Sequence, residues 1–352
     1  MPENLSFSGF FALYILTKGA HKCKIKEKNS EEKTMPIIDM PLEKLKVYQG
    51  INPRPTDFDE FWDKSIAEMK AIDPKAEFVP VDYSSNVADF FDLYFYSTKG
   101  AKIHALFARP KNIEGKIPAV LKFHGLSGNC GEKFDLIPFV AEGYCIASLD
   151  SRGQGGISED VGGHGYTTYS TPFTRGLDGE PENLLCRDLF LDTAMLARIV
   201  MDLSYVDETR VGAYGGSQGG ALTVACAALV PEIKLAATKF PYLSDYKRVW
   251  EMDLDKGAYE GLKYYFRHFD PTHSNEDEVF TKLGYIDIQY LAPRVKAKVL
   301  MTTGLMDTTC PPSTQFAMYN KLTSEKSVVI YPDYSHENIP NQDMIFEFLR
   351  GL

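Results

Sequence analysis

The sequence lacks the features that mark several common classes of protein. Its six cysteines are scattered and form no Cys-x-x-Cys pair, so we expect reduced core residues of a cytoplasmic protein and no disulfide framework. No apolar run reaches the ~20 residues that a membrane helix requires. The net charge is −10 and the main body has no basic block, which argues against nucleic acid and anionic membranes as partners. These absences favour a neutral or cationic small substrate.

Motifs for metals and nucleotide cofactors are also missing. The chain contains no His-Glu-x-x-His sequence, and its acidic residues show no ligand spacing. There is no Walker A loop, and no Rossmann glycine fingerprint follows a predicted strand. We therefore expect the protein to work without a metal or a cofactor.

The first 34 residues differ in character from the rest of the chain. An apolar run covers residues 7–16, and a lysine-rich polar segment covers residues 17–34. The apolar run has the length of a signal-peptide core, but Glu3 precedes it and lysines follow it where small residues should stand. We expect a weakly ordered extension before a start at Met35, with secretion as the alternative, and a single domain over residues 35–352.

The body of the chain alternates between strand-like and helical stretches. Two aromatic and apolar runs, 89–96 and 102–108, are separated by Lys99-Gly100, which predicts an antiparallel hairpin that opens a sheet. Later apolar runs of strand length alternate with helices, a pattern typical of a mostly parallel, doubly wound α/β sheet. The predicted strands are 119–123, 144–149, 210–214, 298–303 and 327–331, and the predicted helices are 57–71, 134–142, 184–203, 217–229, 312–322 and 342–349. Residues 243–290 break the rhythm, and we expect a helical insertion there that covers the carboxyl edge of the sheet.

One glycine-rich segment joins a predicted strand to a small-residue helix and reads Gly215-Gly216-Ser217-Gln218-Gly219. A turn this sharp holds the serine in a strained backbone conformation, and only glycine two residues away on each side clears the neighbouring strand and helix. The helix begins at the serine, so its free N–H groups face a developing oxyanion. We predict that Ser217 is a nucleophile and that Gly215 and Gly219 support it structurally; a glycine-rich surface turn is the alternative.

A catalytic serine needs a base, and the base needs an acid to orient it. In α/β-hydrolase folds these groups follow the serine along the chain in the order acid, then histidine, each on a loop after a strand. His336 follows the last predicted strand, whereas His268 and His273 follow none. Asp307 follows the preceding strand and is favoured over Asp333, which lies only three residues before the histidine. A surface histidine and an N-cap-like aspartate are the structural alternatives.

The oxyanion hole needs two backbone N–H groups. One is expected from Gln218, the residue after the nucleophile. The other is expected from Leu126, because the predicted strand before it runs into His124-Gly125 and a loop that is free to approach the substrate. His124 precedes the serine in the chain, and we expect it to brace this loop.

Taken together, these motifs resemble those of the acetyl xylan esterase / cephalosporin C deacetylase family, carbohydrate esterase family seven, within the α/β-hydrolase superfamily. The resemblance extends over residues 35–352 and includes segments 52–62 and 304–314. The element Arg152-Gly153-Gln154 separates this family from other α/β-hydrolases. The motifs that carry the resemblance are His124-Gly125-Leu126-Ser127-Gly128, Arg152-Gly153-Gln154-Gly155, Gly215-Gly216-Ser217-Gln218-Gly219-Gly220 and His336-Glu337.

The resemblance implies a serine carboxylesterase that deacetylates small substrates such as xylo-oligosaccharides and cephalosporin C through an acyl-enzyme. It implies the triad Ser217, Asp307 and His336, with oxyanion donors at Gln218 and Leu126. The family pattern usually has tyrosine where this chain has Leu126, and the backbone donor is retained with either side chain.

The same resemblance implies an assembly and a supporting role for two more residues. Arg152 and Gln154 are expected to brace the loop beside the triad through ion pairs or hydrogen bonds. The family is typically a homohexamer whose active sites face an internal cavity that admits small acetylated oligosaccharides. Two other interpretations remain open at this point: a peptidase of the prolyl-oligopeptidase type, and a catalytically silent α/β-hydrolase fold that serves as an interaction module.

Overall fold

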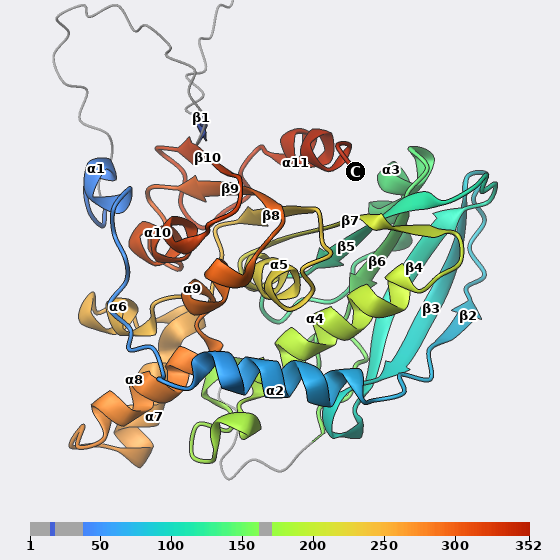
Figure 1. The fold of residues 1–352 in the computed structure, drawn as a ribbon. Helices are drawn as coiled ribbons and strands as arrows, with labels where there is room; N and C mark the ends of the chain where they lie inside the picture. Colours follow the sequence, from blue (N-terminus) through green and yellow to red (C-terminus); the bar gives the residue numbers. More distant parts are fainter. Residues whose placement is uncertain (1–14, 18–37, 162–170) are drawn as a thin grey trace, which may run out of the picture.

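The computed structural model describes residues 15–17, 38–161 and 171–352 of the chain. Within these residues, ten strands form one sheet in the order β1-β10-β9-β8-β7-β5-β6-β4-β3-β2 (Figure 1). The strands are β1 Ile15–Thr17, β2 Glu77–Pro80, β3 Ala88–Tyr96, β4 Lys102–Pro110, β5 Ile117–Phe123, β6 Cys145–Leu149, β7 Val206–Gly216, β8 Leu235–Lys239, β9 Lys298–Gly304 and β10 Lys326–Tyr331.

The strand directions confirm the predicted α/β-hydrolase fold. Strands β6, β5, β7, β8, β9 and β10 are parallel to one another, whereas β2, β3 and β4 pair antiparallel and join the sheet through β6, and β1 pairs antiparallel with β10. The strand order reverses at β5, which lies between β6 and β7. In open α/β sheets, ligands bind at the carboxyl ends of the strands beside such a reversal.

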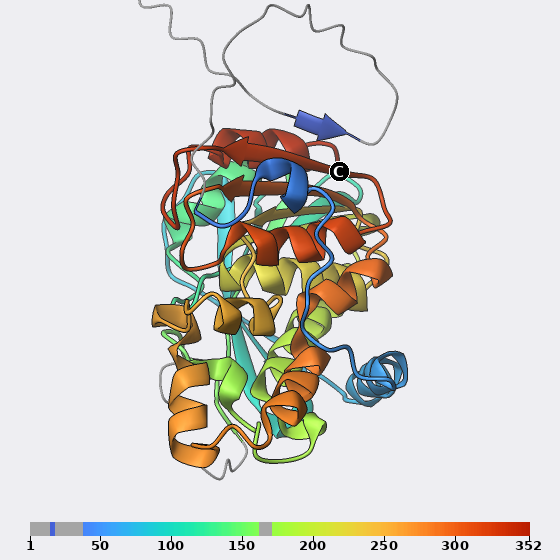
Figure 2. The same ribbon diagram turned by 90° about the vertical axis from the view of Figure 1, so that its left-hand side faces the viewer.

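Helices cover both faces of the sheet (Figures 1 and 2). Helices α3 and α11 pack on one face, while α4, α5 and α10 pack on the other, with α2 outside α4. Each face has its own apolar core, because these strands present apolar side chains in both directions. The helices are α1 Leu42–Leu45, α2 Phe58–Lys70, α3 Lys133–Ala141, α4 Leu185–Met201, α5 Gln218–Leu229, α6 Tyr246–Glu251, α7 Glu260–Phe269, α8 Glu276–Leu283, α9 Ile288–Leu291, α10 Pro312–Lys321 and α11 Gln342–Leu349.

Strand β8 is the strand of the parallel part of the sheet that the sequence pattern did not predict. Its sequence, Leu-Ala-Ala-Thr-Lys, contains two alanines, which favour helices over strands. In the fold both alanines are buried, and Ala236 lies in the core that contains helix α5, where a small side chain lets the helix approach the sheet closely. Tertiary packing therefore decides the conformation of β8.

Two segments were predicted to lie outside the alternating strands and helices: the extension 1–34 and the insertion 243–290. Residues 15–17 form β1, which pairs antiparallel with β10, and the other residues of the 1–34 extension lie outside the described part. Segment 243–290 contains α6, α7, α8 and most of α9. The division of the chain into an extension and one domain stays a prediction. None of the helices in the described ranges combines the length and the apolar character needed to cross a bilayer.

Candidate active site

Ser217 lies at the turn between β7 and α5, at the carboxyl end of the sheet. Its backbone has φ 57° and ψ −121°, a strained conformation for a residue with a side chain. A Cβ at Gly215 or at Gly219 would collide with the carbonyl oxygen of Phe123 on β5. Both flanking glycines are thus required by close packing, as the sequence argument expected.

The structure brings the three predicted triad residues together. The Nε2 atom of His336 lies 3.0 Å from the Oγ of Ser217, and its Nδ1 atom lies 2.8 Å from an Oδ of Asp307. Asp307 follows β9 and His336 follows β10, so both reach the serine from the same edge of the sheet. The imidazole ring also packs against the ring of Phe240, with the centroids 4.4 Å apart. This arrangement suits proton transfer from the serine to the histidine.

Asp307 is held in place by its own loop. One of its carboxylate oxygens accepts hydrogen bonds from the N–H groups of Thr309 and Cys310, at 2.9 and 2.8 Å, and the residue is fully buried. The rival acid Asp333 is exposed, and within the described residues it forms no hydrogen bond with the catalytic histidine. The local turn therefore holds Asp307 within hydrogen-bond distance of His336, and its role as the orienting acid stays a prediction.

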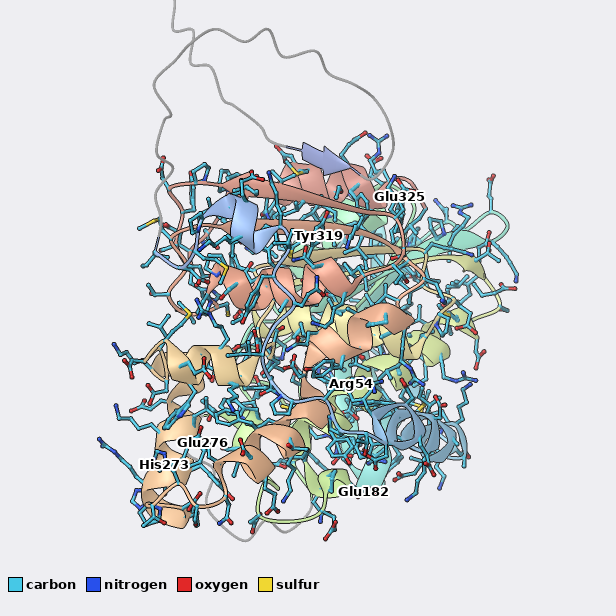
Figure 3. The ribbon with its side chains drawn as sticks, turned by 60° about the vertical axis from the view of Figure 1, so that its left-hand side comes forward. Arg54, Glu182, His273, Glu276, Tyr319 and Glu325 are labelled. Carbon is cyan, nitrogen blue, oxygen red and sulfur yellow. The ribbon has the colours of Figure 1, made fainter. Side chains whose placement is uncertain are left out.

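The other two histidines that follow Ser217 in the chain lie elsewhere. His268 is exposed on α7. His273 lies between α7 and α8 and forms an i,i+3 ion pair with Glu276 at 3.4 Å (Figure 3). Neither histidine contacts the triad.

The two predicted oxyanion donors flank the nucleophile. A Cβ on Gly125 would lie 3.9 Å from the Cβ of Ser217, so the loop that carries Leu126 runs directly beside the serine. Gln218 is the first residue of α5, where backbone N–H groups have no partner within the helix. Within the described part of the chain, neither N–H group makes a hydrogen bond. Both are available to an oxyanion.

Gln154 connects the two sides of the oxyanion hole. Its side-chain oxygen accepts a hydrogen bond from the Ser127 N–H at 2.9 Å and one from the side-chain amide of Gln218 at 3.0 Å. Its own amide donates back to the side-chain oxygen of Gln218 at 3.0 Å. One side chain thereby ties the loop of Leu126 to the residue after the nucleophile. The brace that the sequence led us to expect at Gln154 is therefore a bridge between the two predicted donors.

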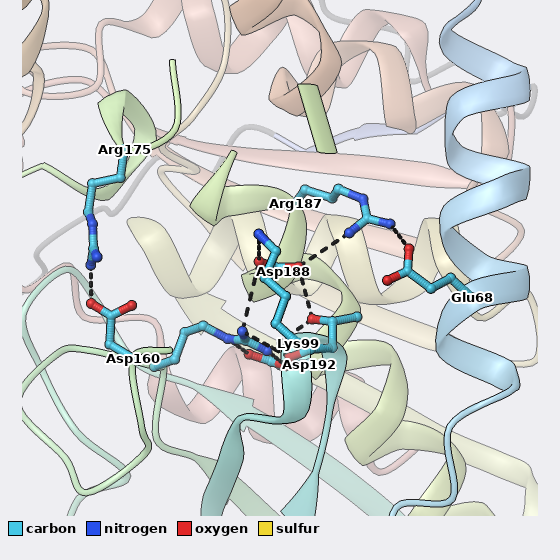
Figure 4. A network of polar contacts seen from close by, with 9 residues as sticks. Glu68, Lys99, Asp160, Arg175, Arg187, Asp188 and Asp192 are labelled. Carbon is cyan, nitrogen blue, oxygen red and sulfur yellow. Dashed lines mark hydrogen bonds and ion pairs between the residues drawn. The ribbon is translucent and has the colours of Figure 1, made fainter. Parts of the chain in front are cut away.

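Arg152 is fully buried and pairs with Asp188 and Asp192, two carboxylates on α4 that Figure 4 labels. Its guanidinium binds Asp192 through two hydrogen bonds of 2.7 and 2.5 Å and donates to the Oγ of Thr98 at 3.1 Å. Asp188 on the same helix accepts from Thr98 and from Arg187. We call Arg152, Arg187, Asp188 and Asp192 the buried ion-pair cluster. It anchors the loop after β6 to α4.

Two histidines stabilise the loops around the oxyanion hole. His124 accepts a hydrogen bond from the Ser151 N–H at its Nε2 atom, 3.0 Å away, and its Nδ1 atom lies 2.7 Å from the carbonyl oxygen of Gly125. Burial lowers the pKa of His124, so the neutral ring with its proton on Nδ1 fits these partners. His124 braces its loop as expected.

His104 on β4 is a brace that no sequence pattern indicated. Its two ring nitrogens lie 2.6 Å from Asp150 and 3.0 Å from Asp92. Burial alone would lower the pKa of His104, but the hydrogen bonds to the two carboxylates outweigh it and raise that pKa. Asp150 in turn accepts from the N–H groups of Cys130 and Ile157. An imidazolium is thus held between two carboxylates beneath the loop that carries Leu126.

Cys310 is a second neighbour of the triad that sequence reasoning missed. The thiol is fully buried, which raises its pKa well above the usual range. Its sulfur, a carboxylate oxygen of Asp307 and a ring nitrogen of His336 lie within 4.8 Å of one another. In the described residues the only other such set is His104, Cys130 and Asp150, in which the side chains of His104 and Asp150 are already engaged in the brace described above.

Comparisons with known proteins show the family of the chain. The sequence profile described as acetyl xylan esterase (AXE1) matches residues 35–352. The chain belongs to the acetyl xylan esterase family. A crystal structure of a family member, acetyl xylan esterase 1 from Thermoanaerobacterium sp. JW/SL YS485, is 51% identical, with a TM-score of 0.87 over 88% of this chain and 98% of that chain. The acetyl xylan esterase from Paenibacillus sp. R4 is 35% identical, with a TM-score of 0.85 over 89% of this chain and 99% of that one.

A curated relative shares the acetyl esterase description. The acetyl esterase Axe7A from Xylanibacter ruminicola is 26% identical over 298 residues, which are 80% of this chain. The match spans 63% of the length of that relative.

Proposed function

We propose that this member of the acetyl xylan esterase family is a serine carboxylesterase that removes acetyl groups from small acetylated substrates. The single observation that carries the proposal is the hydrogen-bonded chain from Ser217 through His336 to Asp307, with distances of 3.0 and 2.8 Å. The free N–H groups of Leu126 and Gln218 beside the serine support acyl transfer, because that reaction develops a negative oxygen that such donors stabilise.

The mechanism follows from this geometry. His336, oriented by Asp307, removes the proton of Ser217 as the serine oxygen attacks the acetyl carbonyl. The N–H groups of Leu126 and Gln218 stabilise the oxyanion of the tetrahedral intermediate. The alcohol leaves with a proton from the histidine, and water then repeats the sequence on the acetyl-enzyme and releases acetate.

The first experiment replaces the nucleophile. Ser217→Ala is expected to lower kcat for p-nitrophenyl acetate by about 10⁴-fold or more, since the acyl-enzyme can no longer form. The melting temperature should stay close to that of the wild type. Ser324→Ala, on the loop between α10 and β10, is the matched control and should keep full activity. Undiminished turnover by Ser217→Ala would refute the proposal.

The substrate class is proposed to be acetylated xylo-oligosaccharides and cephalosporin C. Two similar solved structures are described as acetyl xylan esterases, which supports the carbohydrate part. Release of acetate from both compounds, measured beside short p-nitrophenyl esters, tests this class. Cleavage of proline amides at a comparable kcat/KM would favour a peptidase and contradict the substrate assignment. A silent interaction module would show no labelling of Ser217 by an organophosphate.

We further propose a homohexamer in the cytoplasm. Family resemblance supports the hexamer, and light scattering coupled to size exclusion should give six times the chain mass. Four free cysteines buried in the fold, Cys145, Cys186, Cys226 and Cys310, support a reducing compartment. Fractionation of cells that express the untagged protein tests the location, and recovery outside the cytoplasm would contradict it.

A further inference from the structure

A second cavity lies close to the catalytic serine but on another side of its strand. The cavity measures about 580 Å³ and is lined by Gly215 and Gly216, the last two residues of β7, and by the first turns of α3 and α11. None of Ser217, Asp307 and His336 lines it. Small-molecule sites typically enclose about 300–1,000 Å³, so the cavity is large enough for a ligand of its own.

Aromatic rings form much of its wall. The Phe139 ring lies 5.5 Å from the Tyr214 ring and 4.9 Å from the Phe346 ring, centroid to centroid. Phe134 also lines the cavity, and it is 70% exposed. An apolar ligand with a flat ring would bury these surfaces, and aromatic pairs add a preference for specific ring geometry.

Lys239 is the polar group that sets the charge preference of the cavity. Its side chain is half-buried at the end of β8, and its Nζ lies 4.9 Å from the ring of Phe240. Burial lowers its pKa, and within the described residues it forms no hydrogen bond or ion pair. A cation that is partly removed from water without a partner costs stability, and a bound anion would remove that cost.

The other polar groups around the cavity differ in their burial and in their hydrogen-bond partners. Lys122 forms an ion pair with Asp135 at 3.5 Å. Asp343, in the first turn of α11, is exposed at the cavity. Asn341 is 1% exposed and donates to Thr302 at 2.7 Å, while its Oδ1 atom has no partner among the described residues. Among the described lining residues, Lys239 is thus the one cation without an ion pair, and the buried Oδ1 atom of Asn341 and the exposed side chains of Gln342 and Asp343 also have no hydrogen-bond partner.

We propose that this cavity binds a small carboxylate that carries a flat apolar ring. The carboxylate pairs with the ammonium of Lys239, and the ring packs against Phe139 and Phe346. The site is distinct from the one that takes the acetyl ester, because the end of β7 lies between them.

The binding test uses the full chain with its nucleophile blocked. Ser217 is first labelled with a diethyl phosphoryl group, so that a carboxylate cannot bind in the catalytic site. Titration calorimetry with 2-naphthoate should then show one binding site per chain. Its neutral analogue 2-naphthylmethanol should bind at least about tenfold more weakly, since a charge-assisted hydrogen bond is lost. Acetate should also bind more weakly, because it has no ring.

The variant Lys239→Met tests the cation directly. It should weaken 2-naphthoate binding by about tenfold or more, while Lys234→Met, an exposed lysine just before β8, should leave it unchanged. The melting temperature of Lys239→Met should rise by about 1–2 °C, because an unpaired, partly buried charge is removed. A labelled protein that binds no 2-naphthoate would overturn the proposal. Equal binding by Lys239→Met, or equal binding of the neutral analogue, would also overturn it.

Discussion

We call the edge of the sheet that carries Leu126, Ser217 and Gln218 the catalytic edge. The short loop of residues 152–154 contacts both this edge and the buried ion-pair cluster. The two regions differ in how fully their polar groups are paired. At the edge, the N–H groups of Leu126 and Gln218 have no partner in the described residues, and Ser217 has a strained φ of 57°. In the cluster, the charge of Arg152 is paired twice over with Asp192. Two residues further on, Gln154 turns back to the edge.

This difference separates the groups that react from the groups that hold them. Donors that are fixed but unsatisfied can stabilise a developing charge without reorganising first. A buried charge without a partner would be strongly destabilising, so the cluster has to be complete before the loop can take its position. Variants in the two regions should therefore fail in different ways, one in turnover and the other in stability.

The largest effect on turnover at the catalytic edge is expected from a change of Asp307. Asp307→Asn should lower kcat for p-nitrophenyl acetate by about 10⁴-fold, because the amide no longer stabilises the imidazolium or selects its tautomer. The free energy of unfolding should change far less than the activity. Asp333→Asn is the control and should retain near wild-type turnover. A large loss in Asp333→Asn, with activity retained in Asp307→Asn, would reverse the assignment of the acid.

In the buried ion-pair cluster, the main effect is expected on stability and not on turnover. Arg152→Met leaves Asp192 buried without its partner, and the free energy of unfolding in urea should fall by about 3–5 kcal/mol. The double variant Arg152→Met/Asp192→Leu should recover most of that loss, because both charges are gone. An equally unstable double variant would show that packing of the arginine, and not its pairing, stabilises the loop.

Gln154 links the two regions, so its variant should give an intermediate result. Gln154→Ala removes the bridge between Ser127 and Gln218 and should lower kcat about tenfold, with little change in KM. Stability should fall by about 1 kcal/mol. Gln154→Glu keeps an acceptor for the Ser127 N–H but loses the donor to Gln218. Its kcat should therefore lie between that of the wild type and that of Gln154→Ala. A variant that loses stability but no turnover would place Gln154 with the cluster.

The smallest effect is expected from the brace beneath the oxyanion loop. The pKa of His104 is raised in the folded protein, so its contribution to stability is fully present below its ordinary pKa and is lost as pH rises through the folded-state pKa. Urea unfolding should therefore show a small fall in stability on going from about pH 6 to pH 9. His104→Gln should flatten this dependence, and the exposed His268→Gln should not. A wild-type slope in His104→Gln would contradict the imidazolium.

Much of the fold was readable from local patterns. Each predicted strand from 119–123 to 327–331 overlaps a strand of the sheet, and the ends differ by at most a few residues except at β7, which begins at Val206. Short, continuous apolar runs have few alternatives to a buried parallel strand. Strand β8 was not predicted because alanine has a low preference for strands. Its conformation depends on the close approach of α5.

The site divides in the same way. The sequence alone determined Ser217, Asp307 and His336 as candidates, because the glycine spacing of the turn and the order of loops after strands are properties of the chain itself. Only the tertiary structure decided that the Cys310 sulfur lies within 4.8 Å of Asp307 and His336, that His104 joins two carboxylates, and that Lys239 lines a cavity without an ion pair among the described residues. These contacts join residues far apart in the chain, and their energies depend on burial, which no local pattern records.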